Sequence, residues 1–280
     1  MLQVGVYSEP PVVEVKSKKI ISEIKCSLNE TPENITNNIK LNIDKDFPQI
    51  VPHETQPDKV VCVVAGGPSL HNTFDLLKKK KNQGCPVVAL NGAYKFCIDR
   101  GLNPSAMIML DSREFNKRFV EPTLDKCKYF IASQCHPSVF DKLSGQEAYI
   151  WHCAGDTDNE HLLEEKYNGQ YYPVMGGSTV TFRAIHLLRM LGFCKFEIFG
   201  FDSCIMDEHH AYSQPENDEE QEIEVVLGDR KFRCTVAHFQ QAKEFVQLVS
   251  TTGDHYELSV HGDGLISYII KHPEILKEAA

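Results

Sequence analysis

The 280-residue sequence has no long apolar run, no closely paired cysteines and no excess of basic residues. No apolar stretch approaches the roughly 20 residues of a membrane-spanning helix, and no signal-peptide pattern opens the chain. We therefore expect a soluble, cytoplasmic protein without membrane contact. The ten cysteines occur singly, with no Cys-x-x-Cys spacing, which is typical of reduced core thiols and not of a structural zinc site. A formal charge of -10 argues against general nucleic-acid binding, although a local basic patch stays compatible with it.

The sequence also contains no internal repeat and no low-complexity tract. It is 42% hydrophobic and 24% charged over 280 residues, a composition that supports one large α/β domain or a domain with an appendage. Such a chain is long enough to fold without disulfides. Small charged metabolites, bound by backbone amides or a metal, remain compatible with its acidic charge.

Residues 60–70, with the sequence VVCVVAGGPSL, predict a buried strand, a tight turn and the start of a helix. Gly66 and Gly67 allow the backbone to approach a ligand closely, and the helix N-terminus beyond them offers amides with partial positive charge. This combination suits a phosphate. A strand–helix turn without any ligand is the alternative.

Apolar runs alternate with helical patterns through the rest of the chain. Strands are predicted at 60–64, 86–90, 106–110, 128–132, 148–152, 195–200 and 256–260. The pattern indicates an α/β fold with a Rossmann-like, mostly parallel sheet and helices on both faces. Residues 1–55 read as an N-terminal appendage and 56–280 as the nucleotide-binding transferase core, with an insertion or lid at about 205–234 that contains a β-hairpin.

In such a sheet the carboxyl ends of the strands form the ligand crevice. Five residues that follow strands are therefore expected on one rim: Gly66, Asn91, Asp111, Ser133 and Asp202.

A second glycine-rich turn, formed by residues 175–179, precedes the helix that runs to Leu191. Gly177, Ser178 and Thr179 offer amides and hydroxyls to a phosphate or a ribose. Packing alone would explain one glycine but not the whole cluster.

Asp111 and Asp202 each directly follow an apolar strand. A carboxylate in this position can hold Mg²⁺, hydrogen-bond a ribose or act as a general base, and helix capping is the alternative. The loop after Asp202 carries His209 and His210, of which one is a candidate acid or base. His238 is a weaker candidate, because histidines at such positions often cap helices.

Three motifs in this order carry a family resemblance: residues 65–70, residues 176–192 and residues 198–202. Together they resemble the 6-hydroxymethylpterin diphosphokinase MptE-like group, and they look similar to the related bacterial sialyltransferases and motility-associated glycosyltransferases. The resemblance covers about residues 59–270. Residues 4–7, 133–137 and 260–264 look similar to tailed-phage and prophage proteins of this group, for which the location would be the host cytoplasm.

The resemblance implies a nucleotide lying against Gly66, Gly67 and Ser69, with Asn91 on its phosphate or ribose. It further implies that Gly177 and Ser178 lie by the base or ribose.

The same resemblance matches His210 to the family's His-Ala loop and leaves the base open between His210 and His238. Asp111 stands where the sialyltransferases have Asn in a metal-independent site. A carboxylate beside a phosphate favours bound Mg²⁺, so Asp111 and Asp202 are the predicted metal ligands.

Three functions follow as hypotheses. The first is a glycosyltransferase-like enzyme that moves a group from a nucleotide-activated donor to an acceptor alcohol. The second is an ATP-dependent diphosphokinase acting on a pterin-like alcohol. The third is a non-catalytic nucleotide-binding or virion-associated protein. The sequence leaves the oligomeric state open, with a homo-oligomer as one option.

Overall fold

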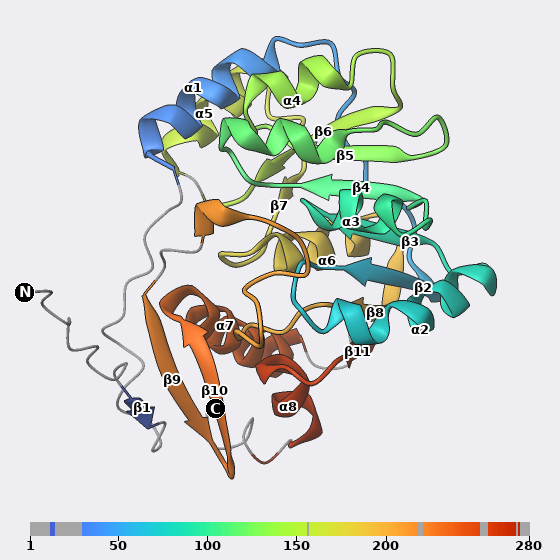
Figure 1. Ribbon diagram of the computed structural model, residues 1–280. Helices are drawn as coiled ribbons and strands as arrows, with labels where there is room; N and C mark the ends of the chain where they lie inside the picture. The colour runs from blue at the N-terminus through green and yellow to red at the C-terminus, as the bar shows by residue number, and fades with distance from the viewer. Residues whose placement is uncertain are drawn as a thin grey trace, which may run out of the picture.

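The computed structural model describes residues 12–14, 30–155, 157–217, 221–252, 257–272 and 274 (Figure 1). Residues 1–11 and 15–29 of the predicted appendage lie outside these ranges. Between them, β1 covers Val12–Glu14.

A parallel sheet of eight strands forms the centre of the protein, in the order β11-β8-β2-β3-β4-β5-β6-β7. The strands are β2 Gln56–Val64, β3 Val87–Leu90, β4 Ala106–Met109, β5 Lys128–Ala132, β6 Ala148–Cys153, β7 Pro173–Val174, β8 Phe193–Phe199 and β11 Glu257–His261. Every residue of β3 and β4 is buried, as expected for parallel strands covered by helices on both faces. The predicted α/β fold is confirmed.

Helices follow most of the strands. They are α1 Pro32–Ile43, α2 Leu70–Asn82, α3 Ala93–Asp99, α4 Pro137–Lys142, α5 Thr157–Tyr167, α6 Val180–Met190, α7 Val236–Thr252 and α8 Leu265–Lys271, with 3-10 helices η1 Glu114–Val120 and η2 Pro215–Asn217. Helix α5 and the 3-10 helix η1 were not predicted, because neither carries a clear apolar stripe. Gly192, with a φ of +95°, follows Leu191, the C-cap residue of α6.

The order of the strands reverses beside β2. The chain proceeds from β2 through β7 in one direction and then returns to place β8 on the other side of β2. The loops after β2 and β8 therefore meet, and the Gly67 N–H donates to the Gly200 carbonyl at 2.7 Å. This reversal is the point at which open α/β sheets bind ligands.

A separate small sheet lies at the far end of the molecule from α1, α4 and α5 (Figure 1). Its antiparallel hairpin consists of β9 Glu222–Leu227 and β10 Arg230–Thr235, and β1 pairs with β9 in parallel. The hairpin confirms the prediction for this part of the chain. Residues 204–217, here called the lid segment, connect the main sheet toward this hairpin and cross the carboxyl edge of the sheet.

Helix α1 comes from the predicted appendage and lies over the loops that follow β4 and β5. Two buried asparagines attach it there. The Asn38 side-chain amide donates to the carbonyls of Ser112 and Gln134 at 3.1 and 3.0 Å. Asn42 donates to the carbonyls of Ser133 and Cys135 at 2.9 and 2.7 Å. The N-terminal region therefore helps to form the edge of the sheet where the candidate site lies.

Among the described residues, no helix combines the length and the apolarity needed to span a membrane. The cysteines in the same residues are all free thiols. Most of them are buried in the core, as the sequence predicts.

Candidate functional site

A cleft of about 330 Å³ opens at the carboxyl edge of the sheet. Its walls come from the loops after β2, β3, β4 and β8, the starts of α6 and α7, and the lid segment. The predicted site residues that line it are Gly66, Gly67, Asn91, Asp111, Ser178, Thr179, Asp202, His210 and His238. Ser69 and Gly177 are not part of this lining, but Ser69 bonds to Asp202 and Gly177 precedes Ser178, which both line it. The structure therefore gathers the predicted residues around one cleft.

Asp202 secures the first glycine-rich turn. Its Oδ2 accepts the Ser69 N–H at 2.8 Å, and its side chain is among the buried polar groups, with an exposed fraction of 2%. A Cβ on Gly67 would overlap this carboxylate, so the glycine makes room for it. Burial raises the pKa of Asp202, and the hydrogen bond from Ser69 opposes that shift. Asp202 therefore accepts a hydrogen bond from one of the amides at the start of α2 that were predicted to face a phosphate.

Tyr212 of the lid segment fills the space beside the turns after β2 and β3. An ideal Cβ on Gly66 would lie 2.7 Å from the Tyr212 hydroxyl, and one on Gly92 would lie 2.6 Å from Tyr212 Cζ. The Ala211 N–H also donates to the Gly66 carbonyl at 2.9 Å. The two glycines thus admit an aromatic side chain of this protein. Sequence analysis did not find this role, because the contact joins segments that are distant in the chain.

Glu244 of α7 holds the second glycine-rich turn. Its Oε2 accepts the Ser178 N–H at 2.8 Å and the Ser178 hydroxyl at 2.9 Å. A Cβ on Gly177 would overlap the same carboxylate. Thr179 caps α6 by accepting the Thr181 N–H. A carboxylate of this chain therefore contacts each of the two turns predicted to bind a phosphate.

Asp111 forms a two-pronged ion pair with Arg113. The Arg113 Nη2 lies 2.7 Å from Asp111 Oδ2, and the Arg113 Nε lies 3.1 Å from Oδ1. The backbone N–H of Arg113 donates to Oδ1 as well, at 3.0 Å. Both side chains are largely buried, with exposed fractions of 12% for Asp111 and 16% for Arg113. Arg113 is a cleft residue that sequence analysis missed, although it stands only two positions from Asp111.

Asn91 connects the ends of two strands. Its φ is +45°, in the left-handed region that asparagine tolerates better than most residues. Its Oδ1 accepts the Leu110 N–H at 3.1 Å, and its own N–H donates to the Ile108 carbonyl. Asn91 thus fixes the edge of the cleft while its side chain lines it.

A chain of hydrogen bonds extends from Arg113 to His210. The Arg113 Nη1 donates to Asn217 Oδ1 at 3.2 Å, which places the Asn217 Nδ2 donor against His210 Nε2, also at 3.2 Å. In this arrangement His210 Nε2 is an acceptor and the proton lies on Nδ1. The His210 ring also stacks on Tyr212, with centroids 5.7 Å apart. His210 is therefore held in a form that can accept a proton.

His238 is held in the opposite form. Its Nδ1 accepts the Thr235 N–H at 3.3 Å, and Thr235 Oγ1 accepts the His238 N–H at 3.2 Å. These reciprocal bonds cap the first turn of α7 and leave the proton on Nε2. Burial lowers the pKa of His238 to about 3, and the nearby His210 and His209 add to the shift. A neutral donor of this kind fits hydrogen bonding to a ligand better than proton abstraction.

Three other histidines have structural partners. His136 caps α4 by accepting the Ser138 N–H, and His261 pairs with Glu197. His209 lies beside Glu222 of the hairpin, with 3.8 Å between Nε2 and Oε1.

The donor set around the cleft does not fit the predicted Mg²⁺ shared by Asp111 and Asp202. Both oxygens of Asp111 contact Arg113, and Asp202 is buried against the Ser69 amide. Among the residues that the structure describes, no three His, Cys, Asp or Glu side chains gather in a way that could hold a metal ion.

Comparison with known proteins supports the fold and identifies the family. The structure resembles that of the MAf glycosyltransferase from Magnetospirillum magneticum AMB-1, with a TM-score of 0.66 and 16% sequence identity. The match covers 82% of this chain but only 36% of that glycosyltransferase. A search of curated proteins found no match. The family model described as 6-hydroxymethylpterin diphosphokinase MptE-like matches residues 33–208, more than half of the chain, and the protein therefore belongs to this MptE-like family.

Proposed function

We propose that the protein is a nucleotide-dependent transferase of the glycosyltransferase type, which moves a group from a nucleotide-activated donor to an acceptor hydroxyl. The observation that carries the proposal is the chemistry of the cleft lining. Neutral hydrogen-bonding side chains outnumber the charged ones in it: Asn91, Ser112, Gln134, Ser178, Thr179, Thr181, Ser203, Gln214, Asn217 and Gln241. Such groups suit the hydroxyls of a sugar and a ribose. Family membership and the shared fold support this class of reaction.

The charge of the lining favours a donor with few phosphates. Arg113 is the only arginine or lysine among the described residues of the lining, which also contains the carboxylates of Glu30, Asp111 and Asp202. A triphosphate would meet more negative than positive charge in this cleft. A donor with a single phosphate meets less repulsion, so the lining favours it over ATP.

In the proposed complex the donor lies along the Gly66–Gly67 turn and Asn91, with its base or ribose near Ser178 and Thr179. His210 acts as the general base for the acceptor hydroxyl, which replaces Asn217 Nδ2 as the donor to the Nε2 lone pair. The Nε2–H of His238 donates a hydrogen bond to the ligand. Asp202 holds the first turn in place through Ser69.

The second candidate function is diphosphoryl transfer from ATP to a pterin-like alcohol. The description of the family favours it. This reaction needs cationic charge beside the phosphates, and Asp111 can bind a metal only after it releases Arg113. We therefore place this function second. A non-catalytic nucleotide-binding role is the third.

Calorimetric melting with nucleotides separates these functions. The protein is melted with CMP, CMP- and UDP-sugars, and ATP, each with Mg²⁺ and with excess chelator. A ligand at a hundred times its Kd adds about 2.7 kcal/mol to the free energy of unfolding. The proposal expects stabilisation by a nucleotide sugar that survives chelation. Stabilisation by ATP only in the presence of Mg²⁺ would favour the diphosphokinase, and no response to any nucleotide would contradict the proposal.

His210→Ala then tests catalysis itself. We expect turnover of the stabilising donor to fall about a hundredfold with little change in its Kd, as for a general base. His161→Ala, an exposed histidine on α5, serves as the control. Unchanged turnover in His210→Ala would remove the assigned base, and no turnover in the unaltered protein would favour the non-catalytic role.

A further inference from the structure

We propose that Arg113 binds the anionic group of the ligand, a phosphate, and that Asp111 is the positioning residue that holds its guanidinium. The identity of the ligand as a nucleotide rests on the proposed function. The recognition of an anion by Arg113 rests on the geometry of the cleft alone.

The hydrogen bonds of Arg113 leave part of its guanidinium available. Arginine has five N–H donors in a planar fork. Nε–H and one Nη2–H face Asp111, and one Nη1–H faces Asn217. One N–H on Nη1 and one on Nη2 therefore form no hydrogen bond with Asp111 or Asn217. Two donors of one guanidinium can meet two oxygens of a phosphate.

The guanidinium is also held rigidly. Besides Asp111 and Asn217, it stacks over the Phe115 ring, with 4.6 Å from Cζ to the ring centroid. Only 16% of the Arg113 side chain is exposed, so little water competes for its remaining donors. An anion that binds there does not have to immobilise a flexible side chain, and this preorganisation favours binding.

Arg113 is the only permanent cation among the described residues of the lining. Asp111 balances its charge when the cleft is empty of ligand, which lowers the cost of burying the cation. The same carboxylate repels an incoming anion, so the pair should favour a group of low charge over a triphosphate. This expectation agrees with the preference for a single phosphate inferred from the whole lining.

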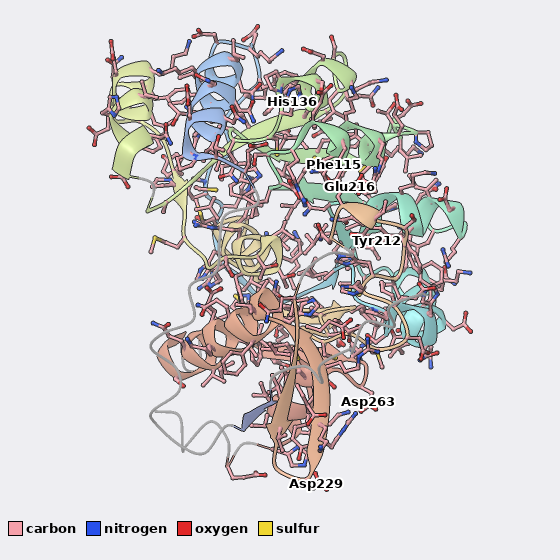
Figure 2. All side chains as sticks on the ribbon, turned by 60° about the vertical axis from the view of Figure 1, so that its left-hand side comes forward. Phe115, His136, Tyr212, Glu216, Asp229 and Asp263 are labelled. Carbon is pink, nitrogen blue, oxygen red and sulfur yellow. The ribbon has the colours of Figure 1, made fainter. Side chains whose placement is uncertain are left out.

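Arg118 supplies a matched control. It lies on η1, the 3-10 helix that begins directly after Arg113, and it also stacks on Phe115, at 4.9 Å. Its guanidinium pairs with Glu216 of the lid segment at 2.6 and 2.8 Å, and it is not part of the cleft lining. Figure 2 shows Phe115, Glu216 and Tyr212 in the same region of the molecule. Loss of Arg118 therefore removes a similar cation without removing a cleft donor.

The test is isothermal titration in excess chelator of the unaltered protein, Arg113→Gln, Arg113→Lys and Arg118→Gln. The probes are inorganic pyrophosphate, the monophosphates of cytidine, uridine and adenosine, and the three parent nucleosides. We expect Arg113→Gln to lower the affinity for pyrophosphate, and for each nucleotide that the unaltered protein binds, at least tenfold. Its affinity for the nucleoside should change less than twofold. Arg113→Lys keeps the positive charge without the planar guanidinium, so its loss of phosphate affinity should be intermediate. Arg118→Gln should stay within twofold of the unaltered protein for every probe.

Equal phosphate affinity in Arg113→Gln and the unaltered protein would overturn this assignment and leave the proposed function standing. An equal loss for nucleoside and nucleotide would also overturn it, because Arg113 would then act only through the fold. Binding of pyrophosphate without any nucleotide, lost in Arg113→Gln, would support the anion site and contradict the proposed function. If the unaltered protein binds none of the probes, both proposals fail. If Arg113→Gln does not fold, the nucleotide and nucleoside affinities of Arg113→Lys provide the same comparison.

Discussion

The two glycine-rich turns are alike in sequence and differ in their surroundings. At the first turn, the Ser69 amide donates to Asp202, and both residues have exposed fractions of only 2%. At the second turn, the Ser178 amide and hydroxyl donate to Glu244, but Ser178 is exposed and Glu244 is half-buried. Each turn therefore holds a carboxylate of the chain, one inside the protein and one at its surface.

The difference in burial decides what each turn can do. Removing a buried acceptor leaves the Ser69 N–H without a partner and without access to water, which is costly. An exposed acceptor is replaced by water at little cost. The first turn is thus a fixed part of the fold, whereas an anion from solution can compete with Glu244 at the second.

The largest expected effect comes from adding a methyl group to each turn. A Cβ on Gly67 would lie 2.6 Å from the Gly200 carbonyl oxygen, which belongs to the backbone and cannot turn away. We expect Gly67→Ala to lower the free energy of unfolding by about 3 kcal/mol, as for severe overpacking. Gly177→Ala would displace the end of a flexible Glu244 side chain and should cost about 1 kcal/mol. Urea unfolding measures both, and equal losses would contradict the distinction between a fixed and a yielding turn.

Truncating the two carboxylates should give the next effect. Asp202→Ala should lower the free energy of unfolding by about 2 kcal/mol, because a buried N–H loses its acceptor. Glu244→Ala should change it by less than about 0.5 kcal/mol, as at most exposed positions. Thermal unfolding of the two variants under identical conditions makes the comparison. A larger loss of unfolding free energy in Glu244→Ala than in Asp202→Ala would show that the contact at the second turn contributes more to stability.

The pH dependence of stability sharpens the assignment of Asp202. Because burial raises the pKa of this carboxyl in the folded state, its contribution to stability is present below the unfolded pKa and is lost as pH rises through the folded pKa. Asp202→Asn does not titrate. The unaltered protein should therefore lose stability relative to Asp202→Asn as the pH is raised from about 4 toward neutrality. Unfolding free energies of both proteins across this range provide the measurement, and a constant difference would contradict the raised pKa.

The smallest expected effect concerns competition at the second turn. Glu244→Gln keeps an acceptor for Ser178 but removes a negative charge, which at about 4 Å in water corresponds to about 1 kcal/mol. The affinity for a pyrophosphate bound at this turn should therefore rise about fivefold, whereas the affinity for one held by Arg113 alone should change less. Asp229→Asn removes an exposed carboxylate of the β9–β10 turn, which Figure 2 labels at the opposite end of the molecule from α1, and should leave that affinity unchanged. No increase in Glu244→Gln would place the anion away from this turn.

The secondary structure around the site was predictable because its signals are local. The alternation of apolar residues predicted the β2 strand and the helix after it, and the Asn91 and Asp202 positions followed from where the strands end. The same local signal failed for α5 and η1, whose residues bury little apolar surface in a regular pattern. The pairing of Asp111 with Arg113 was not predicted, because two loop residues two positions apart give no periodic signal.

The residues that contact the two glycine-rich turns could not be predicted from the sequence. Asp202 stands 133 residues from the amide it accepts, and Glu244 stands 66 residues from Ser178. Tyr212 meets Gly66 and Gly92 in the same long-range manner.

The sequence by itself determined the α/β pattern, the two turns and the edge of the sheet at which they lie. Those features depend on hydrophobic periodicity and on the backbone preferences of glycine and proline, which act over a few residues. Only the tertiary structure decided that β8 returns beside β2, and with it that carboxylates of the chain contact the turns and that Arg113 is the cation of the cleft. These contacts arise because strand order brings distant loops together, and the burial that results sets which side chains pair and which remain available to a ligand.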